Sequence, residues 1–266
     1  MVQKLKQKVM DGKEITKEEA MTLAEADLDE LCQAADEIRK HFCGNVFDIC
    51  SCINVKGGKC SEDCKFCPQS CFNDKVEVKP HTLIGSDQML EEAAYMAQKG
   101  VVRCDLVSSG RRLPKDDVRK IVQDIERIRK ETGIAVCCSF GLLDQEDCEM
   151  LRKAGITRLH NNLESSRTFF TGVCSSHSTD DKMATLRAAR ATGLTLCSGC
   201  LINLGESMED RIELALMERE LGVKSIPVNV LNPIKDSPFE DRKPMTNEEF
   251  CRTVAVYDWR YREVHQ

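Results

Sequence analysis

Three cysteines with the spacing Cys-x3-Cys-x2-Cys, at Cys60, Cys64 and Cys67, form the most informative pattern in this chain. The spacing places three thiols in one short loop, and no fourth cysteine at motif spacing completes the set. Thiolates are soft ligands that select iron–sulfur clusters, Zn²⁺ or Cu(I). Structural Zn²⁺ sites normally use four protein ligands, whereas a [4Fe–4S] cluster held by three cysteines leaves one iron open to a small molecule. We therefore interpret the loop as catalytic; the alternative is a zinc knuckle completed by Cys71 or by a distant histidine.

Length and composition are those of one large globular domain. The chain has 266 residues, of which 41% are hydrophobic and 31% charged, and barrels of about 250 residues commonly form a single unit. The net charge of -6 gives no electrostatic reason to bind nucleic acid or an anionic membrane. No apolar stretch approaches the ~20 residues that span a bilayer, and the N-terminus lacks the apolar core of a signal peptide. We expect a cytoplasmic protein without a nucleic-acid or membrane partner.

Cysteine is unusually frequent, with sixteen in the chain. A reducing cytoplasm disfavours a disulfide framework, and a free thiol in an apolar run behaves as a small hydrophobic side chain. We therefore expect a core or incidental role for four scattered cysteines: Cys32, Cys43, Cys148 and Cys251.

Alternating strands and helices are expected to position the cysteine loop. Residues 1–43 are predicted to form an N-terminal helical segment, because Thr16 and Glu19 have the spacing of a capping box. Strands are predicted at residues 46–55, 101–108, 134–140, 158–163, 194–202 and 225–231. Helices are predicted between and after them at residues 86–99, 114–132, 144–154, 179–192, 207–221 and 246–260. Residues 44–266 are therefore predicted to form a parallel (β/α) TIM-type barrel with six β–α units.

The candidates for chemistry gather at the ends of the predicted strands, which is the rim where parallel barrels build their active sites. They are the cysteine loop, Ser109 and Arg111, Asn162 and Glu164, Gly205 and Glu206, and Asn229 on the last strand. A full eight-stranded barrel needs two more units than the six visible here. The sequence thus predicts either an open six-stranded barrel or a natural or artificial truncation, with the last two strands absent.

The cysteine loop, with Phe66 before its last cysteine, resembles the loop of the radical S-adenosylmethionine (SAM) enzymes. Longer strings resemble biotin synthases within that superfamily, in the same order and from about residue 20 to about residue 256. These strings are residues 53–70, 107–113, 136–143, 160–166, 196–206 and 225–233.

The resemblance implies that Cys60, Cys64 and Cys67 hold a [4Fe–4S] cluster whose fourth iron is bound by the amino and carboxylate groups of SAM. It implies that Phe66 lies beside the cluster and the adenine. Reductive cleavage of SAM then gives a 5′-deoxyadenosyl radical, and sulfur is inserted into dethiobiotin to form biotin.

The resemblance also implies an auxiliary iron–sulfur cluster, [2Fe–2S] or larger, which lies deeper in the barrel and donates the sulfur. Cys137 and Cys197 match two of its ligands, although the residues alone would make them buried apolar thiols. The third family ligand falls on Asp105, and the neighbouring Cys104 cannot replace it because adjacent strand residues face opposite sides. The remaining family ligand, an arginine on the last strand, lies beyond residue 266.

Two asparagines match family residues that face the substrate, Asn162 and Asn229. An amide suits the ureido ring of dethiobiotin because it offers both a donor and an acceptor. The residues matched to SAM are Glu164 at the ribose, Gly205 and Glu206 at the methionine end, and Ser109 and Arg111. Without the resemblance, these are ordinary polar rim residues, and Gly205-Glu206 is a tight turn before a helix.

Alternatives from other classes stay open at this point. One alternative is a relative in the same superfamily, such as methylornithine synthase or the maturase of iron-only hydrogenase, which share the barrel and the cysteine loop. A second is a degenerate paralogue that binds a cluster without turnover. A third is a zinc-binding fold that holds no iron. The resemblance further implies dethiobiotin as the substrate, an electron donor of the flavodoxin or ferredoxin type, and a homodimer.

Overall fold

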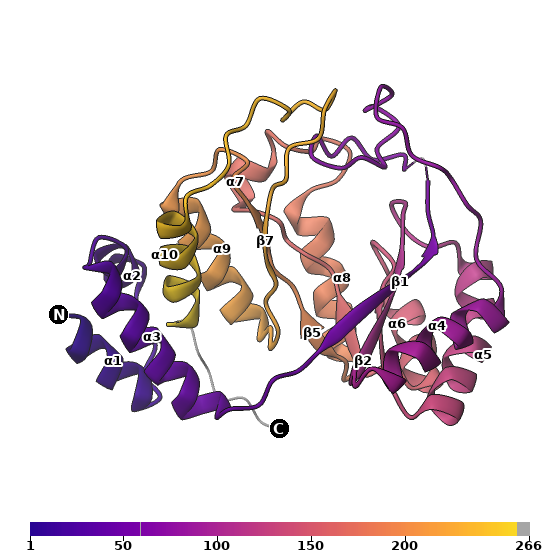
Figure 1. Ribbon diagram of the computed structural model, residues 1–266, viewed down its shortest axis with the longest axis horizontal. Helices are drawn as coiled ribbons and strands as arrows, with labels where there is room; N and C mark the ends of the chain where they lie inside the picture. The colour runs from indigo at the N-terminus through magenta and orange to yellow at the C-terminus, as the bar shows by residue number, and fades with distance from the viewer. Residues whose placement is uncertain (59, 260–266) are drawn as a thin grey trace.

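The computed structural model describes residues 1–58 and 60–259. Three N-terminal helices, α1 (Val2–Met10), α2 (Lys17–Ala24) and α3 (Leu28–Cys43), lie beside the last two helices, α9 (Met208–Leu221) and α10 (Asn247–Asp258). Figure 1 shows the three N-terminal helices with α10 on the left of the molecule. The capping box predicted at Thr16 and Glu19 is confirmed, since both of its reciprocal hydrogen bonds form at the start of α2.

The N-terminal helices do not pack as a body of their own. Leu31 and Ile38 of α3 are buried in one hydrophobic cluster with Val256 and Trp259 at the other end of the chain. Full burial of such a side chain is worth about 1.5–3 kcal/mol. The division of the chain into residues 1–43 and 44–266 therefore stays a prediction, although the helices themselves are present.

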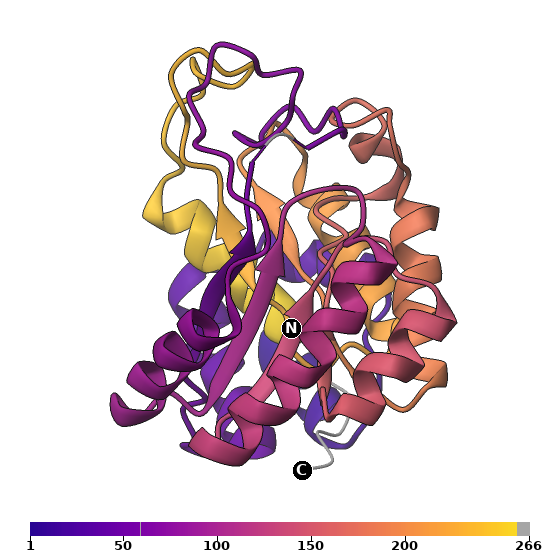
Figure 2. The same ribbon diagram turned by 90° about the vertical axis from the view of Figure 1, so that its right-hand side faces the viewer.

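The rest of the chain alternates strands and helices as predicted. The strands are β1 (Cys50–Lys56), β2 (Arg103–Ser108), β3 (Ala135–Ser139), β4 (Arg158–His160), β5 (Thr195–Cys197), β6 (Cys200–Ile202) and β7 (Val228–Val230). The helices among them are α4 (Ser86–Gln98), α5 (Lys115–Thr132), α6 (Gln145–Ala154), α7 (Arg167–Phe170) and α8 (Thr179–Ala191), followed by α9. The paired strands run parallel and the helices cover their outer side (Figures 1 and 2), so the predicted barrel architecture is confirmed.

The sheet follows the order of the chain. Strands β1 to β5 form one ladder and β6 pairs with β7, and bridges between Glu164 and Cys200 and between Cys197 and Ser225 join the two parts. The single strand predicted at 194–202 is interrupted at Gly199. A Cβ atom there would lie 2.0 Å from the carbonyl oxygen of Pro227, so only glycine lets the two backbones approach this closely.

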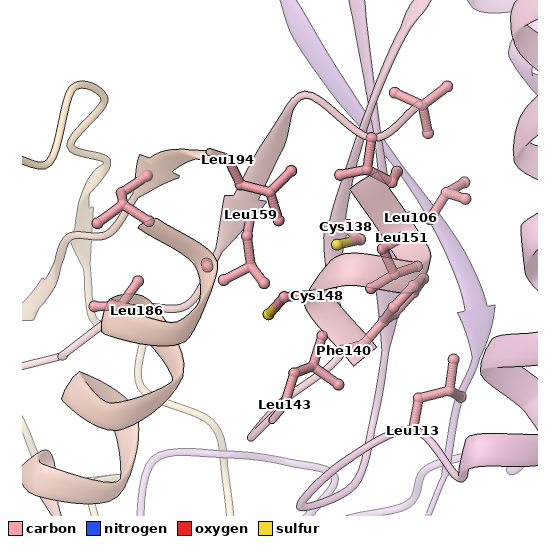
Figure 3. Close-up of a cluster of buried hydrophobic side chains, with 14 of the residues drawn as sticks. Leu106, Leu113, Cys138, Phe140, Leu143, Cys148, Leu151, Leu159, Leu186 and Leu194 are labelled. Carbon is pink, nitrogen blue, oxygen red and sulfur yellow. The ribbon is translucent and has the colours of Figure 1, made fainter. Parts of the chain in front are cut away.

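Alternation along each strand separates the outer core from the interior of the barrel. On β2, Cys104 and Leu106 are fully buried in the layer between sheet and helices, whereas Arg103 and Asp105 face the other side. Figure 3 shows Cys138 and Cys148 among leucines of this layer. The core role predicted for Cys148 is confirmed.

The other three cysteines for which a core or incidental role is predicted, Cys32, Cys43 and Cys251, lie away from the barrel interior. Cys32 packs against the N-terminal cluster, Cys43 is half-buried, and Cys251 is exposed. None of them lines the two cavities described below, as the prediction of an incidental role requires.

Element boundaries depart from the predictions in a few places. The described helices end within one or two residues of the predicted ones, and the end of the prediction at residue 260 lies outside the described residues. β1 begins at Cys50 rather than at residue 46, because its partner β2 begins opposite it at Arg103 and leaves Val46 and Phe47 exposed. The short helix α7 was not predicted.

Candidate active site

The cysteine loop connects β1 to α4 and lies at the carboxyl ends of the strands, at the top of Figure 2. Its arms are tied together by backbone hydrogen bonds. The N–H of Cys60 donates to the carbonyl of Gln69 at 2.6 Å, and the N–H of Cys67 donates to the carbonyl of Cys64 at 3.0 Å. The loop therefore presents its three cysteines from one tightly turned segment.

A glycine permits the crossing at the base of this loop. Gly58 has a φ of 122°, and a Cβ atom there would lie 2.4 Å from Cβ of Pro80. Its N–H donates to the side-chain oxygen of Gln69 at 2.9 Å. Any other residue at position 58 would force the two arms of the loop apart.

A cavity of about 330 Å³, here called the rim cavity, lies against the loop. All three cysteines of the motif line it. So do four of the residues predicted to bind SAM: Phe66, Ser109, Arg111 and Glu164. They come from the segments after β1, β2 and β4, which the parallel sheet brings to one edge.

A second segment of the chain anchors the cysteine loop. The N–H groups of Ser175 and Ser176 both donate to Oδ1 of Asp63 at 2.9 Å. Nδ1 of His177 lies 2.7 Å from Oε2 of Glu62. Burial raises the pKa of Glu62, but hydrogen bonds from His177 and Ser176 outweigh it and bring the pKa below its ordinary value.

A fourth thiol, Cys174, lies just outside the rim cavity. Its Sγ is 3.6 Å from Sγ of Cys64 and 3.3 Å from Nδ1 of His177. The hydrogen bond from Cys64 lowers the pKa of Cys174 to about 4, against the opposing effect of burial. Within the described residues, these three form the one group of His, Cys and acidic ligand atoms that all lie within 4.8 Å of one another.

This arrangement bears on the zinc-knuckle alternative. Cys71 is exposed and does not line the rim cavity, whereas His177 is a histidine distant in sequence that stands close to Cys64. Cys60 and Cys67 lie outside that compact group. The three motif cysteines as a set are therefore spread more widely than the ligands of a single ion.

A second cavity, of about 360 Å³ and here called the interior cavity, lies inside the barrel. Cys137 and Cys197 both line it, together with Asp105 and Asn229. Burial raises the pKa of Cys137 to about 12 and that of Cys197 to about 11. Burial likewise raises the pKa of Asp105 to about 6.

Cationic and polar groups surround these thiols. Nη1 of Arg103 lies 3.6 Å from Sγ of Cys137, and Nδ1 of His160 lies 3.2 Å from Sγ of Cys197. The buried Nε atoms of Arg103 and Arg158 and the Oδ1 atom of Asp105 have no hydrogen-bond partner. Buried polar atoms are normally paired, so the cavity offers polar atoms that a bound polar group could satisfy.

Comparison with known proteins assigns the chain to a family. Residues 54–217 match the model of the radical SAM superfamily. The chain is 47% identical over 253 residues to the biotin synthase of Brachyspira hyodysenteriae, across 95% of this chain and 76% of that protein. It is 49% identical over 256 residues to biotin synthase 2 of Corynebacterium diphtheriae, across 96% of this chain and 78% of that protein. The chain belongs to the biotin synthase family. A solved methylornithine synthase, 23% identical, shares the fold with a TM-score of 0.83 over 97% of this chain and 77% of that one.

The rim cavity fits the [4Fe–4S] cluster and SAM of the biotin synthase family. It offers three soft thiols, and its volume lies in the range of small-molecule sites. Burial raises the pKa of Cys60 and of Cys67. These thiols therefore become thiolates most readily when a cationic metal offsets the cost of burial.

The interior cavity fits the auxiliary iron–sulfur cluster of the family. Burial holds its thiols neutral, and a bound metal would favour their thiolate forms. The guanidinium groups of Arg103 and Arg158, which both lie 3.8 Å from Asp48, are suited to an anionic group. Asn229 lines the same cavity, and its Nδ2 donates to the carbonyl of Cys200 at 3.3 Å. Asn229 and the two thiols therefore face one shared space.

Three predicted site residues lie outside both cavities: Asn162, Gly205 and Glu206. The side-chain oxygen of Asn162 is buried without a hydrogen-bond partner. Glu206 accepts hydrogen bonds from the backbone N–H groups of residues 203–205 and from Arg211. That geometry favours the tight-turn interpretation of Gly205-Glu206, and a role in SAM binding stays a prediction.

Sequence reasoning missed five residues near these cavities: Cys50, Cys52, His160, Cys174 and His177. The first two carried a signal, because cysteines two residues apart on a strand face the same side. A Cys-x2-His spacing marked Cys174 and His177.

Proposed function

We propose that this chain carries out radical SAM-dependent insertion of sulfur into dethiobiotin to form biotin, with the two cavities dividing the work. The observation that carries the proposal is the presence of two cysteine-lined cavities in one barrel, in a member of the biotin synthase family. When bound, the [4Fe–4S] cluster with SAM supplies a carbon radical able to remove hydrogen from unactivated carbon, and the auxiliary cluster supplies the sulfur.

At the rim cavity, the protein's task is to hold the [4Fe–4S] cluster and to orient SAM. We assign Cys60, Cys64 and Cys67 to the cluster and Phe66 to the position beside it. Glu164 is suited to hydroxyl groups because its carboxyl is largely buried and lies 3.9 Å from the ammonium group of Lys182. Burial raises the pKa of Glu164, and a bound polar group would offset that cost.

Arg111 and Ser109 also line the rim cavity and are assigned to the same ligand. Nη1 of Arg111 is 3.1 Å from Oε2 of Glu62, so the guanidinium is already oriented by the loop. The Gly205-Glu206 turn is assigned to the methionine end of SAM through its backbone. The carboxylate of Glu206 is not assigned, because it already accepts hydrogen bonds from the N–H of Leu204 and from Arg211.

At the interior cavity, Cys137 and Cys197 are assigned to the auxiliary cluster and Asn229 to the ureido ring of dethiobiotin. Asn162, which lies outside that cavity, is assigned to the same ring. An amide side chain can donate to the ring carbonyl and accept from a ring N–H. The unpaired, buried oxygen of Asn162 supports an acceptor role. The barrel wall would exclude water from the reacting carbon.

Partners and location follow from the same chemistry. We propose a homodimer, an electron donor of the flavodoxin or ferredoxin type, and a cytoplasmic location. All sixteen cysteines are free thiols, which supports a reducing compartment. No helix in the described part of the chain combines the length and the apolar character that a membrane crossing requires. Sedimentation velocity of the reconstituted protein would test the dimer.

The decisive experiment is anaerobic reconstitution followed by incubation with SAM, dethiobiotin and a reductant. We expect about four irons per chain at the rim, further iron that is lost in Cys137→Ala, and biotin as a product. 5′-Deoxyadenosine without biotin would indicate a different substrate of the same superfamily. Iron without either product would indicate a cluster-binding paralogue, and zinc without iron would overturn the proposal.

A further inference from the structure

Two cysteines of the interior cavity have no role in the assignment above, Cys50 and Cys52, both on β1. They are two residues apart, so their side chains lie on the same face of the strand, and both line the cavity. In the register of the sheet, Cys52 pairs with Asp105 of β2, and Asp105 pairs in turn with Cys137 of β3. One row of the sheet therefore places a thiol on each side of the aspartate.

Asp105 stands where the family resemblance predicts a third cluster ligand. Its side chain is a poor substitute, because iron–sulfur clusters are held by thiolates and a carboxylate is a harder ligand. One carboxyl oxygen accepts a hydrogen bond from Ser139 at 2.6 Å, and the other is buried without a partner. Cys52 offers the missing thiol from the next strand, at the same level of the sheet.

Spacing and charge both favour a cluster rather than a single ion at this place. Among the described residues, the cysteines of the interior cavity do not form a group within 4.8 Å of one another, so they are too far apart to share one ion. An iron–sulfur cluster is larger than an ion and spans such gaps. Arg103 and Arg158 line the cavity, and both lie 3.8 Å from Oδ2 of Asp48. Their two positive charges exceed the one negative charge of Asp48 and would offset part of the negative charge of a thiolate-ligated cluster.

We propose that Cys52 and Cys50 complete the ligand set of the auxiliary cluster, which then has four thiolate ligands with Cys137 and Cys197. The inference rests on the proposed function only in that it requires a cluster in the interior cavity. Two of the ligands would come from β1 at one end of the five-stranded sheet, one from the central strand β3, and one from β5 at the other end.

The test uses the full chain with Cys60, Cys64 and Cys67 all changed to alanine, so that all iron belongs to the interior cavity. After anaerobic reconstitution, iron and sulfide are measured per chain, Mössbauer and absorption spectra are recorded, and iron loss to a chelator is timed. Adding Cys52→Ala or Cys50→Ala should speed iron loss at least roughly tenfold, since even outer-shell partners contribute that much to metal affinity. Cys52→Ser, which keeps a ligand oxygen, should retain more iron than Cys52→Ala with a shifted spectrum.

Cys104→Ala is the matched control, because Cys104 adjoins Asp105 but is buried in the outer core. It should leave the iron content and the spectra unchanged. If Cys50→Ala and Cys52→Ala also leave them unchanged while Cys137→Ala removes the iron, the four-thiolate set is wrong and the interior cluster stands. If the background protein holds no iron, both this inference and the interior-cluster assignment are overturned.

Discussion

The rim cavity and the interior cavity both gather thiols, but the chain builds them in opposite ways. At the rim, three cysteines within eight consecutive residues arrive on one loop, and hydrogen bonds from a second segment hold that loop in place. In the interior, the proposed ligands come from three separate strands, β1, β3 and β5, and the register of the sheet decides which thiols meet. The rim site therefore depends on local turns, and the interior site depends on the whole barrel.

The side chains around the thiols also differ between the two cavities. In the interior, burial raises the pKa of Cys137 to about 12 and of Cys52 to about 11, and Arg103 and Arg158 line the same cavity. At the rim, carboxylates and a histidine surround the loop, and Glu62 and Asp63 are occupied by hydrogen bonds. The rim arrangement holds a loop in place, whereas the interior arrangement sets cationic side chains beside buried neutral thiols.

The largest expected effect comes from breaking the rim site. Cys64→Ala removes one of three ligands, so the rim cluster is lost and formation of both 5′-deoxyadenosine and biotin falls below detection. Product analysis by chromatography and iron analysis measure this. Cys71→Ala, in the same loop but exposed, should retain both activities; equal losses in the two variants would mean that the loop as a whole, rather than the motif, carries the site.

Breaking the interior site should separate the two products. Cys197→Ala leaves the rim cavity untouched, so SAM cleavage continues while biotin formation is abolished. The ratio of 5′-deoxyadenosine to biotin measures the uncoupling, and Cys251→Ala, an exposed cysteine, should leave the ratio unchanged. Retention of biotin formation in Cys197→Ala would show that the interior cavity is not the source of sulfur.

The same contrast explains what the sequence could predict. The rim motif could be predicted because its three cysteines lie close together in the sequence. The start of α2 could be predicted because Thr16 and Glu19 have the spacing of a capping box. Cys52 was not recognised as a partner of Cys137, because nothing along the chain specifies which strand residues lie level with each other. That information exists only once the sheet has formed.

Glu206 shows the same limit for acidic residues. The sequence allowed Glu206 to be matched to a SAM-binding residue of the family, but it did not predict the surroundings of the side chain. The carboxylate of Glu206 pairs with Arg211 at 2.6 Å, and both side chains are almost fully buried. Cys174 contacts Asp63, and His177 contacts Glu62. The partners of each pair lie over one hundred residues apart in the sequence, so no sequence pattern predicted these contacts. Contacts over such separations follow from packing rather than from spacing.

A pair of conservative variants would sharpen the rim assignment. Glu206→Gln breaks a buried ion pair and should lower the free energy of unfolding by about 3 kcal/mol, with little change in the KM for SAM. Glu164→Gln should leave stability nearly unchanged and raise the KM for SAM roughly tenfold, equivalent to about 1.4 kcal/mol. Denaturant unfolding and initial rates measure the two quantities. The opposite pattern would exchange the roles of the two glutamates.

The smallest expected effect concerns the anchor of the cysteine loop. Asp63→Asn weakens the charge-assisted hydrogen bonds from Ser175 and Ser176, each of which is worth about 1.5–3 kcal/mol at most. In a Cys137→Ala background, where only the rim cluster is present, the loop should open more often and the absorbance of the cluster should bleach a few-fold faster in air. Asp74→Asn, at an exposed position of the same loop, is the control. The anchor contacts only the cysteine loop. In the variant that lacks Cys60, Cys64 and Cys67, Asp63→Asn should therefore leave the bleaching rate of the interior cluster unchanged. If Asp63→Asn speeds the bleaching of both clusters equally, the anchor does not act on the rim site alone.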